Sequence, residues 1–352
     1  MRKLTPRVSG VALAAALTVV PTGSGHPLHH QPGWRLSPTG VDQRLRGLSA
    51  VSARVAWASG SGGVVLRTVD GGRSWQQVGP PGTADLQFRD IEAFDAEHAT
   101  ILAIGEGEAS RIYRTSDGGA HWTLAFQNED PAAFYDCMAF FDRRRGLALS
   151  DPVGGKFRIL ATRDGGRSWQ VRPTDGMPPA LDGEAGFAAS GTCLVTAGPN
   201  AYFASGGPAA RVFRSADGGR TWRVTATGVK ASASAGIFSL AFRTPWDGLA
   251  IGGDYLVPDS ATDNLALTRD GGRTWQPATG PNGYRSGAAW LTGPLAGRVA
   301  LAVGPSGSDV SADGGHTWTG FDTGSFDGVQ CAHDGACWAS GEHGRIARLT
   351  WS

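Results

Sequence analysis

Lysine is almost absent from this chain of 352 residues. It occurs only at Lys3, Lys156 and Lys230, so arginine carries nearly all of the positive charge, and the formal net charge is +1. No stretch or stripe of the sequence is strongly basic. Binding to phosphates requires such a patch. We therefore expect no nucleic acid among the partners.

Long hydrophobic runs are also scarce, and the clearest one lies at the N-terminus. Residues 8–20 are apolar and small, and they follow the basic residues Arg2, Lys3 and Arg7. This pattern is typical of a secretory signal and is too short for a comfortable membrane span. We predict a signal peptide over residues 1–25, a secreted or cell-envelope location in a bacterium, and no transmembrane segment after cleavage.

Sequence signatures of cofactors and metals are missing. The eight histidines are scattered, without the His and Cys spacing of a zinc site. No glycine-rich loop follows a strand and opens a helix, which is the arrangement that binds nucleotide phosphates. We therefore predict no metal and no cofactor.

Cysteine is rare, with four residues in the chain. Cys331 and Cys337 flank the turn-like sequence AHDGA between two strand-like runs, so they can reach disulfide distance, and export would permit the bond. We predict a Cys331–Cys337 disulfide. Cys137 and Cys193 fall in neighbouring repeats, where they either pair with each other or remain buried thiols.

Glycine, by contrast, is abundant, and much of it lies in an octapeptide, [ST]-x-D-G-G-x-[STH]-W, that occurs six times. A β-like run precedes each copy and another begins at its Trp, so each copy is expected to form a hairpin turn. The Asp can accept N–H groups of its own turn, the glycines can take positive φ, and the Trp offers a large apolar surface. These structural residues are Asp70, Asp117, Asp164, Asp217, Asp270 and Asp313, with Trp75, Trp122, Trp169, Trp222, Trp275 and Trp318.

The spacing of the octapeptides predicts the fold. Successive Asp residues are 47, 47, 53, 53 and 43 positions apart, and a period in this range with four strands per unit is typical of a β-propeller. Trp34 stands after a missing octapeptide, and Cys337–Ser352 aligns with Ala56–Asp70 but ends where a seventh octapeptide would start. We predict one all-β domain over residues 26–352, a seven-bladed propeller of four-stranded antiparallel blades. The N-terminal strand around Trp34 pairs with the C-terminal blade and closes the ring.

The strands of each blade are placed by repeating this unit. The innermost strands are expected to begin near Leu48, Arg89, Tyr135, Phe187, Phe238, Ala288 and Gly328. In the fourth unit, Cys193–Gly198 is then the second strand, and Gly198–Ala210 is a link to the third. Such links lie on the face opposite the octapeptides. Variable loops on a rigid scaffold are where binding usually occurs.

Polar residues near the starts of the innermost strands are expected to point towards the mouth of the channel on this loop-rich face. They carry both signs of charge, which suits a polar ligand or a peptide carboxylate, or else a ring of mutual salt bridges. The candidate binding residues are Arg46, Arg89, Asp90, Tyr135, Asp136, Glu184, Arg285 and Asp327.

The octapeptide resembles the Asp-box, or bacterial neuraminidase repeat, which occurs in enzymes and in non-enzymes. The sialidases of that group carry an Arg-Ile-Pro motif, and the nearest string here, Phe157–Leu160, lacks the Pro. A secreted carbohydrate-active enzyme, sialidase-like or another glycoside hydrolase, is the alternative function. Its candidate carboxylate pairs are Asp136 with Glu184 and Asp254 with Asp259. No catalytic residue is assigned.

The unit Leu48–Val78 also resembles the photosystem II stability/assembly factor family. This resemblance implies an exported seven-bladed propeller that binds a protein client without catalysis, in an assembly or scaffold role. We expect a monomer with a protein or peptide partner, whose identity the resemblance does not carry over.

Overall fold

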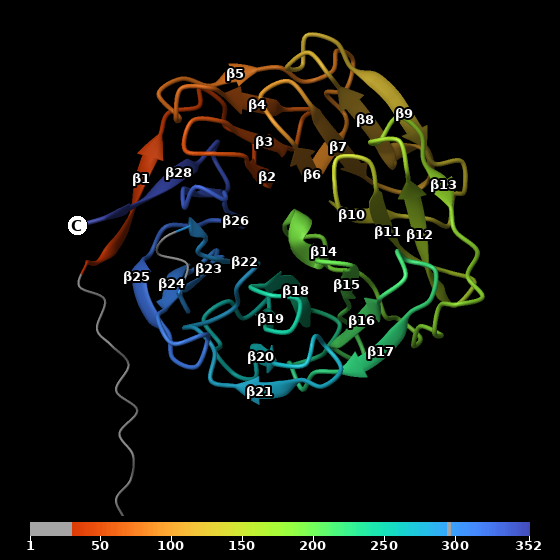
Figure 1. Cartoon of the computed structure of the whole chain (residues 1–352), viewed down its shortest axis with the longest axis vertical. Helices are drawn as coiled ribbons and strands as arrows, with labels where there is room; N and C mark the ends of the chain where they lie inside the picture. Colours follow the sequence, from red (N-terminus) through yellow and green to blue (C-terminus); the bar gives the residue numbers. More distant parts are fainter. Residues whose placement is uncertain (1–29, 294–296) are drawn as a thin grey trace, which may run out of the picture.

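Seven antiparallel sheets form a closed ring in the computed structural model, which describes residues 30–293 and 297–352 (Figure 1). Each sheet is one blade of four strands, and the all-β, seven-bladed prediction is confirmed. The predicted signal peptide lies outside the described residues. In the described part of the chain, no helix is long and apolar enough to cross a membrane.

The first three blades follow the chain from the innermost strand outwards. Blade 1 has β2 (Leu45–Ala50), β3 (Ala56–Gly60), β4 (Val65–Thr68) and β5 (Gln76–Gln77). Blade 2 has β6 (Gln87–Ala93), β7 (Ala99–Ile104), β8 (Arg111–Thr115) and β9 (Thr123–Gln127), with the short 3-10 helix η1 (Gly107–Ala109) before β8. Blade 3 has β10 (Tyr135–Phe140), β11 (Gly146–Val153), β12 (Lys156–Thr162) and β13 (Gln170–Val171).

Three further blades repeat this order. Blade 4 has the 3-10 helix η2 (Gly191–Cys193) and then β14 (Leu194–Ala197), β15 (Asn200–Ala204), β16 (Arg211–Ser215) and β17 (Arg223–Ala226). Blade 5 has β18 (Ala235–Phe242), β19 (Gly248–Asp254), β20 (Leu265–Thr268) and β21 (Gln276–Ala278). Blade 6 has β22 (Gly287–Trp290), β23 (Ala300–Gly304), β24 (Gly307–Ser311) and β25 (Thr319–Asp322).

Blade 7 combines the two ends of the chain, as predicted. Its strands β26 (Gly328–Cys331), β27 (Cys337–Ser340) and β28 (Ile346–Trp351) come from the C-terminus, and β1 (Pro32–Ser37) comes from the N-terminus. β1 pairs antiparallel with β28, with Trp34 opposite Leu349, and the two strands lie side by side at the left of Figure 1. This pairing completes the last sheet and leaves no unpaired edge between the two ends.

Each interface between neighbouring blades contains its own hydrophobic cluster. Between blades 1 and 2, for example, Trp57 packs with Phe88 and Ile101. The octapeptide tryptophans all contact the interface with the preceding blade. Trp34 does the same at the interface of blades 6 and 7. The seventh blade therefore has its Trp although it lacks an octapeptide.

The octapeptides form the turns before the outermost strands. In the first copy, Oδ1 of Asp70 accepts the backbone N–H groups of Arg73 and Ser74 at 3.0 Å. The Ser74 hydroxyl also donates to Asp70 Oδ2, at 2.6 Å. This hydrogen bond, followed by those from the backbone, holds the pKa of Asp70 well below its usual range. Gly71 and Gly72 both have a φ of 79°, a conformation that favours glycine. The turn is therefore stabilised from within.

The fourth blade differs from the strand assignment expected from the sequence. Its innermost strand is β14, not a strand beginning near Phe187, and its second strand is β15, which was expected to be part of a link. Every residue of β15 is buried, as a strand between two blades requires. Residues 187–193 enter the channel instead. The other six innermost strands contain their expected starting residues.

Both pairs of cysteines form disulfides. Cys331 and Cys337 are bonded across the β26–β27 turn, as predicted. Cys137 of β10 is bonded to Cys193 at the end of η2, which settles the alternative between a pair and two thiols. The second bond joins blade 3 to the segment that enters the channel.

Candidate functional site

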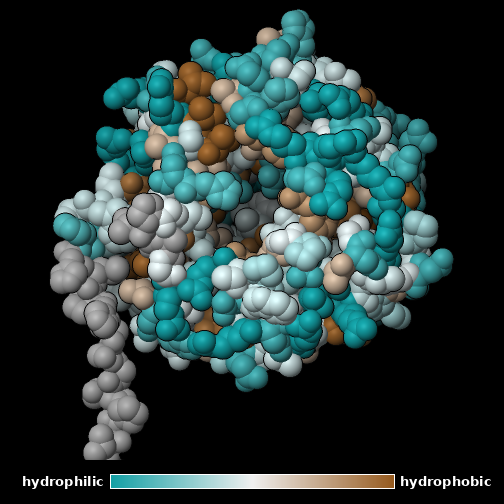
Figure 2. Space-filling view, in the orientation of Figure 1, coloured by the Kyte–Doolittle hydropathy of each residue, from teal (hydrophilic) through white to brown (hydrophobic). Residues whose placement is uncertain are grey.

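A cavity of about 680 Å³ occupies the centre of the ring on the loop-rich face, and the space-filling view shows the ring hollowed at its centre (Figure 2). We call this cavity the funnel. Blades 1–3 and 5–7 contribute to its wall, together with residues 186–189, which precede blade 4. The lining residues with charged side chains are Arg44, Arg46, Arg89, Asp136, Asp151, Asp327 and Glu342, and the aromatic ones are Phe134, Phe187, Phe238, Tyr255 and Tyr284.

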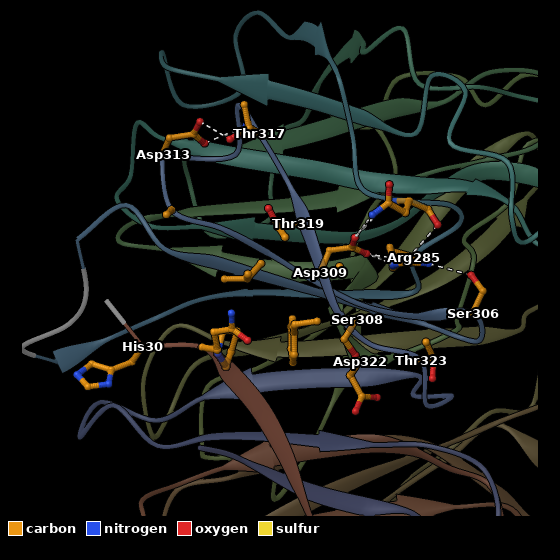
Figure 3. A pocket seen from close by; sticks show the side chains of 17 residues that line it. His30, Arg285, Ser306, Ser308, Asp309, Asp313, Thr317, Thr319, Asp322 and Thr323 are labelled. Carbon is orange, nitrogen blue, oxygen red and sulfur yellow. Dashed lines mark hydrogen bonds and ion pairs between the residues drawn. The ribbon is translucent and has the colours of Figure 1, made fainter. Parts of the chain in front are cut away.

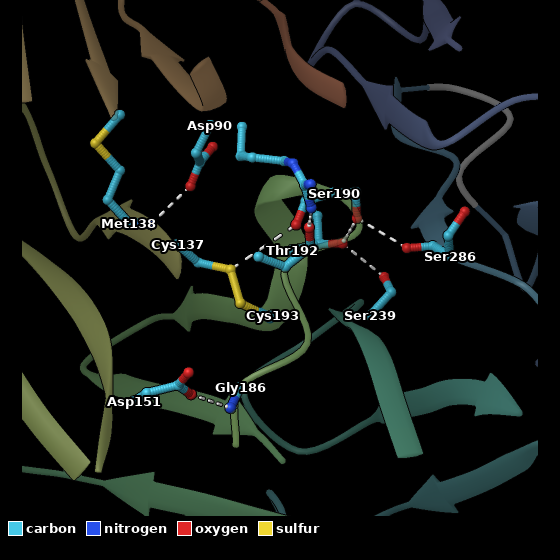
Figure 4. The surroundings of a disulfide bond; sticks show 12 residues. Asp90, Cys137, Met138, Asp151, Gly186, Ser190, Thr192, Cys193, Ser239 and Ser286 are labelled. Carbon is cyan, nitrogen blue, oxygen red and sulfur yellow. Dashed lines mark hydrogen bonds between the residues drawn. A yellow bond between two sulfur atoms is a disulfide. The ribbon is translucent and has the colours of Figure 1, made fainter. Parts of the chain in front are cut away.

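Residues 186–193, which we call the plug, lie in the channel among the innermost strands (Figure 4), and residues 186–189 line the funnel. The Ser190 hydroxyl donates to the carbonyl oxygen of Ser286 in blade 6 at 2.8 Å, and the Thr192 hydroxyl donates to Ser239 Oγ of blade 5 at 2.8 Å. The Cys137–Cys193 disulfide ties the plug to blade 3. The plug is therefore fastened to three blades.

One backbone irregularity explains which side chains reach the funnel. The pairing of the innermost strand with the second strand shifts at a β-bulge in blades 1, 2, 3 and 5. The bulged residues are Arg46, Arg89, Asp136 and Phe238, and all four line the funnel. A bulge re-aims a side chain. The funnel therefore receives one side chain from the same position of each of these blades.

The arginines gather on the side of blades 1 and 2. Arg44 donates from Nε and Nη2 to the two carboxylate oxygens of Asp327, both at 2.7 Å. Arg46 lies 3.9 Å from Asp327 Oδ1 through its Nε. Arg89 donates to the carbonyl oxygen of Ala188 in the plug. Burial, followed by repulsion from Arg46, lowers the pKa of Arg89 to about 10, so it remains a cation at neutral pH.

Two carboxyl groups face the funnel from blade 3. Asp136 is only 2 % exposed, and burial, together with the nearby Asp151 carboxylate, raises its pKa well above the usual range. Burial raises the pKa of Asp151 to about 6. Asp151 accepts the backbone N–H of Gly186 at 2.7 Å. This side of the funnel is therefore acidic.

The remaining wall, from the plug and blades 5 and 6, is aromatic. The ring of Phe238 lies 4.8 Å from that of Phe187 in the plug and 4.7 Å from that of Tyr284. Tyr255 packs on the edge of the same cluster and is half exposed. Its neighbours Leu256 and Val257 are exposed at the rim. The funnel thus has a basic, an acidic and an apolar side.

The structure brings four of the eight candidate binding residues into the funnel: Arg46, Arg89, Asp136 and Asp327. The expectation that the others point towards the channel mouth is wrong for Tyr135, Glu184 and Arg285. Tyr135 precedes the bulged residue and is buried between blades 2 and 3. Glu184 is a buried partner of Arg211.

Arg285 and Asp90 are buried by other contacts. Arg285 is 2 % exposed and donates from Nε to Asp309 Oδ2 at 2.7 Å. Asp90 lies beneath the plug, where its Oδ2 accepts the N–H of Met138 at 2.6 Å, and burial raises its pKa. Sequence reasoning missed Arg44, Asp151, Tyr255 and Tyr284. The bulge of the innermost strand separates Arg46, Arg89 and Asp136 from their buried neighbours, but it does not mark the four residues that were missed.

A second cavity, of about 940 Å³, lies between blade 6 and β1 (Figure 3). Its three carboxylates already accept hydrogen bonds from within the chain, and Asp322, for example, accepts the Gly324 N–H at 2.7 Å. Arg285 and Asp309 form an ion pair, and Asp313 accepts the Thr317 hydroxyl of its own octapeptide turn at 2.7 Å. We therefore place the candidate binding site in the funnel. Across residues 30–293 and 297–352, no group of three or more His, Cys, Asp or Glu side chains is arranged to hold a metal ion.

Solved structures with the same fold include two of YCF48. "YCF48 bound to D1 peptide" matches with a TM-score of 0.65 and 15 % identity over 90 % of this chain and 96 % of that one. YCF48 from Cyanidioschyzon merolae matches with a TM-score of 0.64 and 15 % identity over 90 % and 98 %. The WD40 β-propeller domain of Doa1 matches with a TM-score of 0.59 and 12 % identity over 90 % and 97 %.

At these identities the likeness shows a shared fold. No protein-family model matches the chain, and no curated protein matches its sequence. The Asp-box assignment of the octapeptide therefore stays a prediction.

Proposed function

We propose that this protein binds an extended segment of a protein or peptide in the funnel, in an exported assembly or scaffold role. The observation that carries the proposal is the funnel itself, because it is concave and is lined by the plug and by six of the seven blades. Arg46 and Arg89 offer N–H groups for a carboxylate of the ligand, and the wall formed by Phe187, Phe238 and Tyr284 offers apolar surface for a side chain.

The comparison with solved structures supports a peptide as the ligand. One chain with the same ring of blades is described as YCF48 bound to D1 peptide, so a propeller of this shape accommodates a peptide. The two disulfides and the expected signal peptide support an exported protein. The partner is identified here by its chemistry, as a segment with a carboxylate and an apolar side chain.

The glycoside hydrolase alternative gains no specific support from its expected carboxylate pairs. Asp136 faces the funnel, whereas Glu184 is buried with Arg211. Asp254 lies 3.4 Å from the ammonium group of Lys230. Asp136 and Glu184 therefore lie in different environments, one in the funnel and one in the core, and Asp254 of the other expected pair is already bound to Lys230.

The proposal is tested by the retention of a random dodecapeptide library on immobilised protein. Replacing both Arg46 and Arg89 by Gln removes two charge-assisted donors, each worth about 1.5–3 kcal/mol. We therefore expect the retained fraction to fall at least about tenfold, since 1.4 kcal/mol corresponds to a factor of ten. A thermal melt of the variant checks that the ring remains folded.

The matched control replaces Arg143 and Arg145 by Gln. These arginines lie in the β10–β11 turn on the octapeptide face, and their side chains are 63 % and 66 % exposed. The control variant should retain the library as the wild type does. Equal retention by the funnel variant and the wild type would refute the proposed site.

A further inference from the structure

Two carboxyl groups of blade 3 meet in the funnel without a cationic partner. Asp136 is the bulged residue of β10, and Asp151 lies at a second bulge, between Ser150 and Pro152 of β11. Both reach the same residue of the plug. The Gly186 N–H donates to Asp151 Oδ1, and a Cβ added to Gly186 would lie 2.9 Å from Asp136 Oδ2. The two side chains therefore share one corner of the funnel.

Neither carboxyl group is neutralised by the described part of the chain. No Lys or Arg nitrogen there lies within 4.0 Å of Asp136 or Asp151. Oδ2 of Asp136 is buried and has no hydrogen-bond partner. The charge of Arg89 acts on Asp136, but the Arg89 guanidinium donates to the Ala188 carbonyl oxygen. A buried carboxylate without a partner is costly, so either a proton or an external cation satisfies this pair.

We propose that Asp136 and Asp151 form a subsite for an alkylammonium group of the bound segment. An ammonium group carries three donors and a compact charge, so it can bond both carboxylates at once. The rings of Phe134 and Phe187 also line the funnel, and aromatic rings favour a cation. The inference rests on the proposed peptide-binding function and adds to it: the ligand presents a lysine side chain or a free amino terminus to blade 3.

A calcium ion is a poorer occupant of this corner. Calcium takes six to eight oxygen ligands, and the described residues hold no cluster of three metal-binding side chains. A proton shared between the two carboxyl groups is the other alternative. Both alternatives are outcomes of the test.

The subsite is tested directly with n-butylammonium chloride, so the result does not depend on finding the peptide. Carbon-13 NMR of the Asp carboxyl groups should show a saturable shift of Asp136 and Asp151 with butylammonium, and none with sodium chloride at the same ionic strength. Asp151→Asn should weaken the apparent affinity at least tenfold, whereas Asp142→Asn, at the exposed β10–β11 turn, should leave it unchanged. No saturable shift, or a shift with calcium chloride alone, would overturn the assignment.

Peptide selection distinguishes the two sources of the ammonium group. Peptides retained by the wild type should be enriched in lysine at one position or should require a free amino terminus, and an N-acetylated library separates these cases. Asp136→Asn with Asp151→Asn should abolish the enrichment. If peptides are retained through Arg46 and Arg89 without any preference for an amine, the subsite is refuted and the proposed function stands. A butylammonium response without peptide retention refutes the proposed function alone.

Discussion

Asp151→Asn should change how the stability of this protein depends on pH. Burial raises the pKa of Asp151 from its ordinary value of 3.8 to about 6, although the hydrogen bond from Gly186 opposes this effect. The folded protein therefore binds a proton more tightly than the unfolded chain does. Between about pH 4 and pH 6, the contribution of Asp151 to the free energy of unfolding falls as the pH rises, because Asp151 must ionise inside the ring.

The size of the effect follows from the two pKa values. A difference of about two in pKa corresponds to about 3 kcal/mol, at about 1.4 kcal/mol for each. Asparagine resembles the protonated acid and keeps an oxygen for the Gly186 N–H. The variant should therefore match the wild type near pH 3.5 and exceed it by up to about 3 kcal/mol above pH 7.

Urea unfolding at fixed temperature between pH 3.5 and pH 8 measures both curves. Asp142→Asn is a control variant that should change the stability in the opposite direction. Burial alone would raise the pKa of Asp142, but hydrogen bonds from Arg144 and Arg145 outweigh it and lower the pKa, so this variant should lose stability above pH 4. Parallel curves for Asp151→Asn and the wild type over the whole range would show that the carboxyl group is not held in its acid form.

Three further substitutions test the closure of the ring and the plug. Trp34→Ala removes the indole side chain that packs on Phe321 and Phe326, and it should lower the free energy of unfolding in urea by about 2–3 kcal/mol, somewhat less than for a fully buried Trp. As a control, Trp246→Ala, at a side chain that is 55 % exposed, should cost much less. Replacing Cys137 and Cys193 by Ser opens a loop with a sequence separation of 56 and should cost about 4 kcal/mol, against about 2 kcal/mol for Cys331 and Cys337 with a separation of 6; equal losses would contradict the loop-length argument. Gly191→Ala places a methyl group against Oδ1 of Asp90 and should expel the plug, which faster hydrogen exchange at residues 187–193 would reveal.

The repeat made the fold predictable, because each copy of the octapeptide marks the same turn in successive blades. Each octapeptide fixes a turn through its own Asp and glycines, and each Trp fixes one interface between blades. The alignment of Cys337–Ser352 with Ala56–Asp70 then required the strand around Trp34 to complete the last sheet, which β1 does.

Blade 4 shows where this reasoning stops. Residues 187–193 have the apolar character of an innermost strand, but their position depends on contacts with distant blades. Gly186 and Gly191 allow the plug to pass directly over Asp136 and Asp90, and Ser190 and Thr192 find their partners in blades 6 and 5. Such long-range contacts leave no periodic signal in the sequence.

The candidate site was partly predictable for a related reason. Neighbouring residues of an innermost strand lie in different environments. A side chain next to the bulge is buried between blades, whereas the bulged side chain faces the funnel. Tyr135 and Asp136 illustrate the difference, since they are adjacent and only Asp136 lines the cavity. A polar residue near the start of an innermost strand is therefore not enough to predict a funnel residue. Its position relative to the bulge determines whether its side chain faces the funnel.

This register also separates the stability of the ring from the chemistry of its centre. The buried positions before the bulge, such as Leu45, Phe88 and Ile237, pack against neighbouring blades, so substitution there is limited by volume. The bulged position contacts the open funnel and tolerates Arg46, Arg89, Asp136 and Phe238 in successive blades of the same ring. Exchanging Arg46, whose side chain is partly exposed, should therefore alter ligand selection by the funnel while the unfolding free energy stays close to that of the wild type. A ring that unfolds whenever any bulged residue is replaced would instead mean that these side chains serve the fold, and that the ligand binds elsewhere.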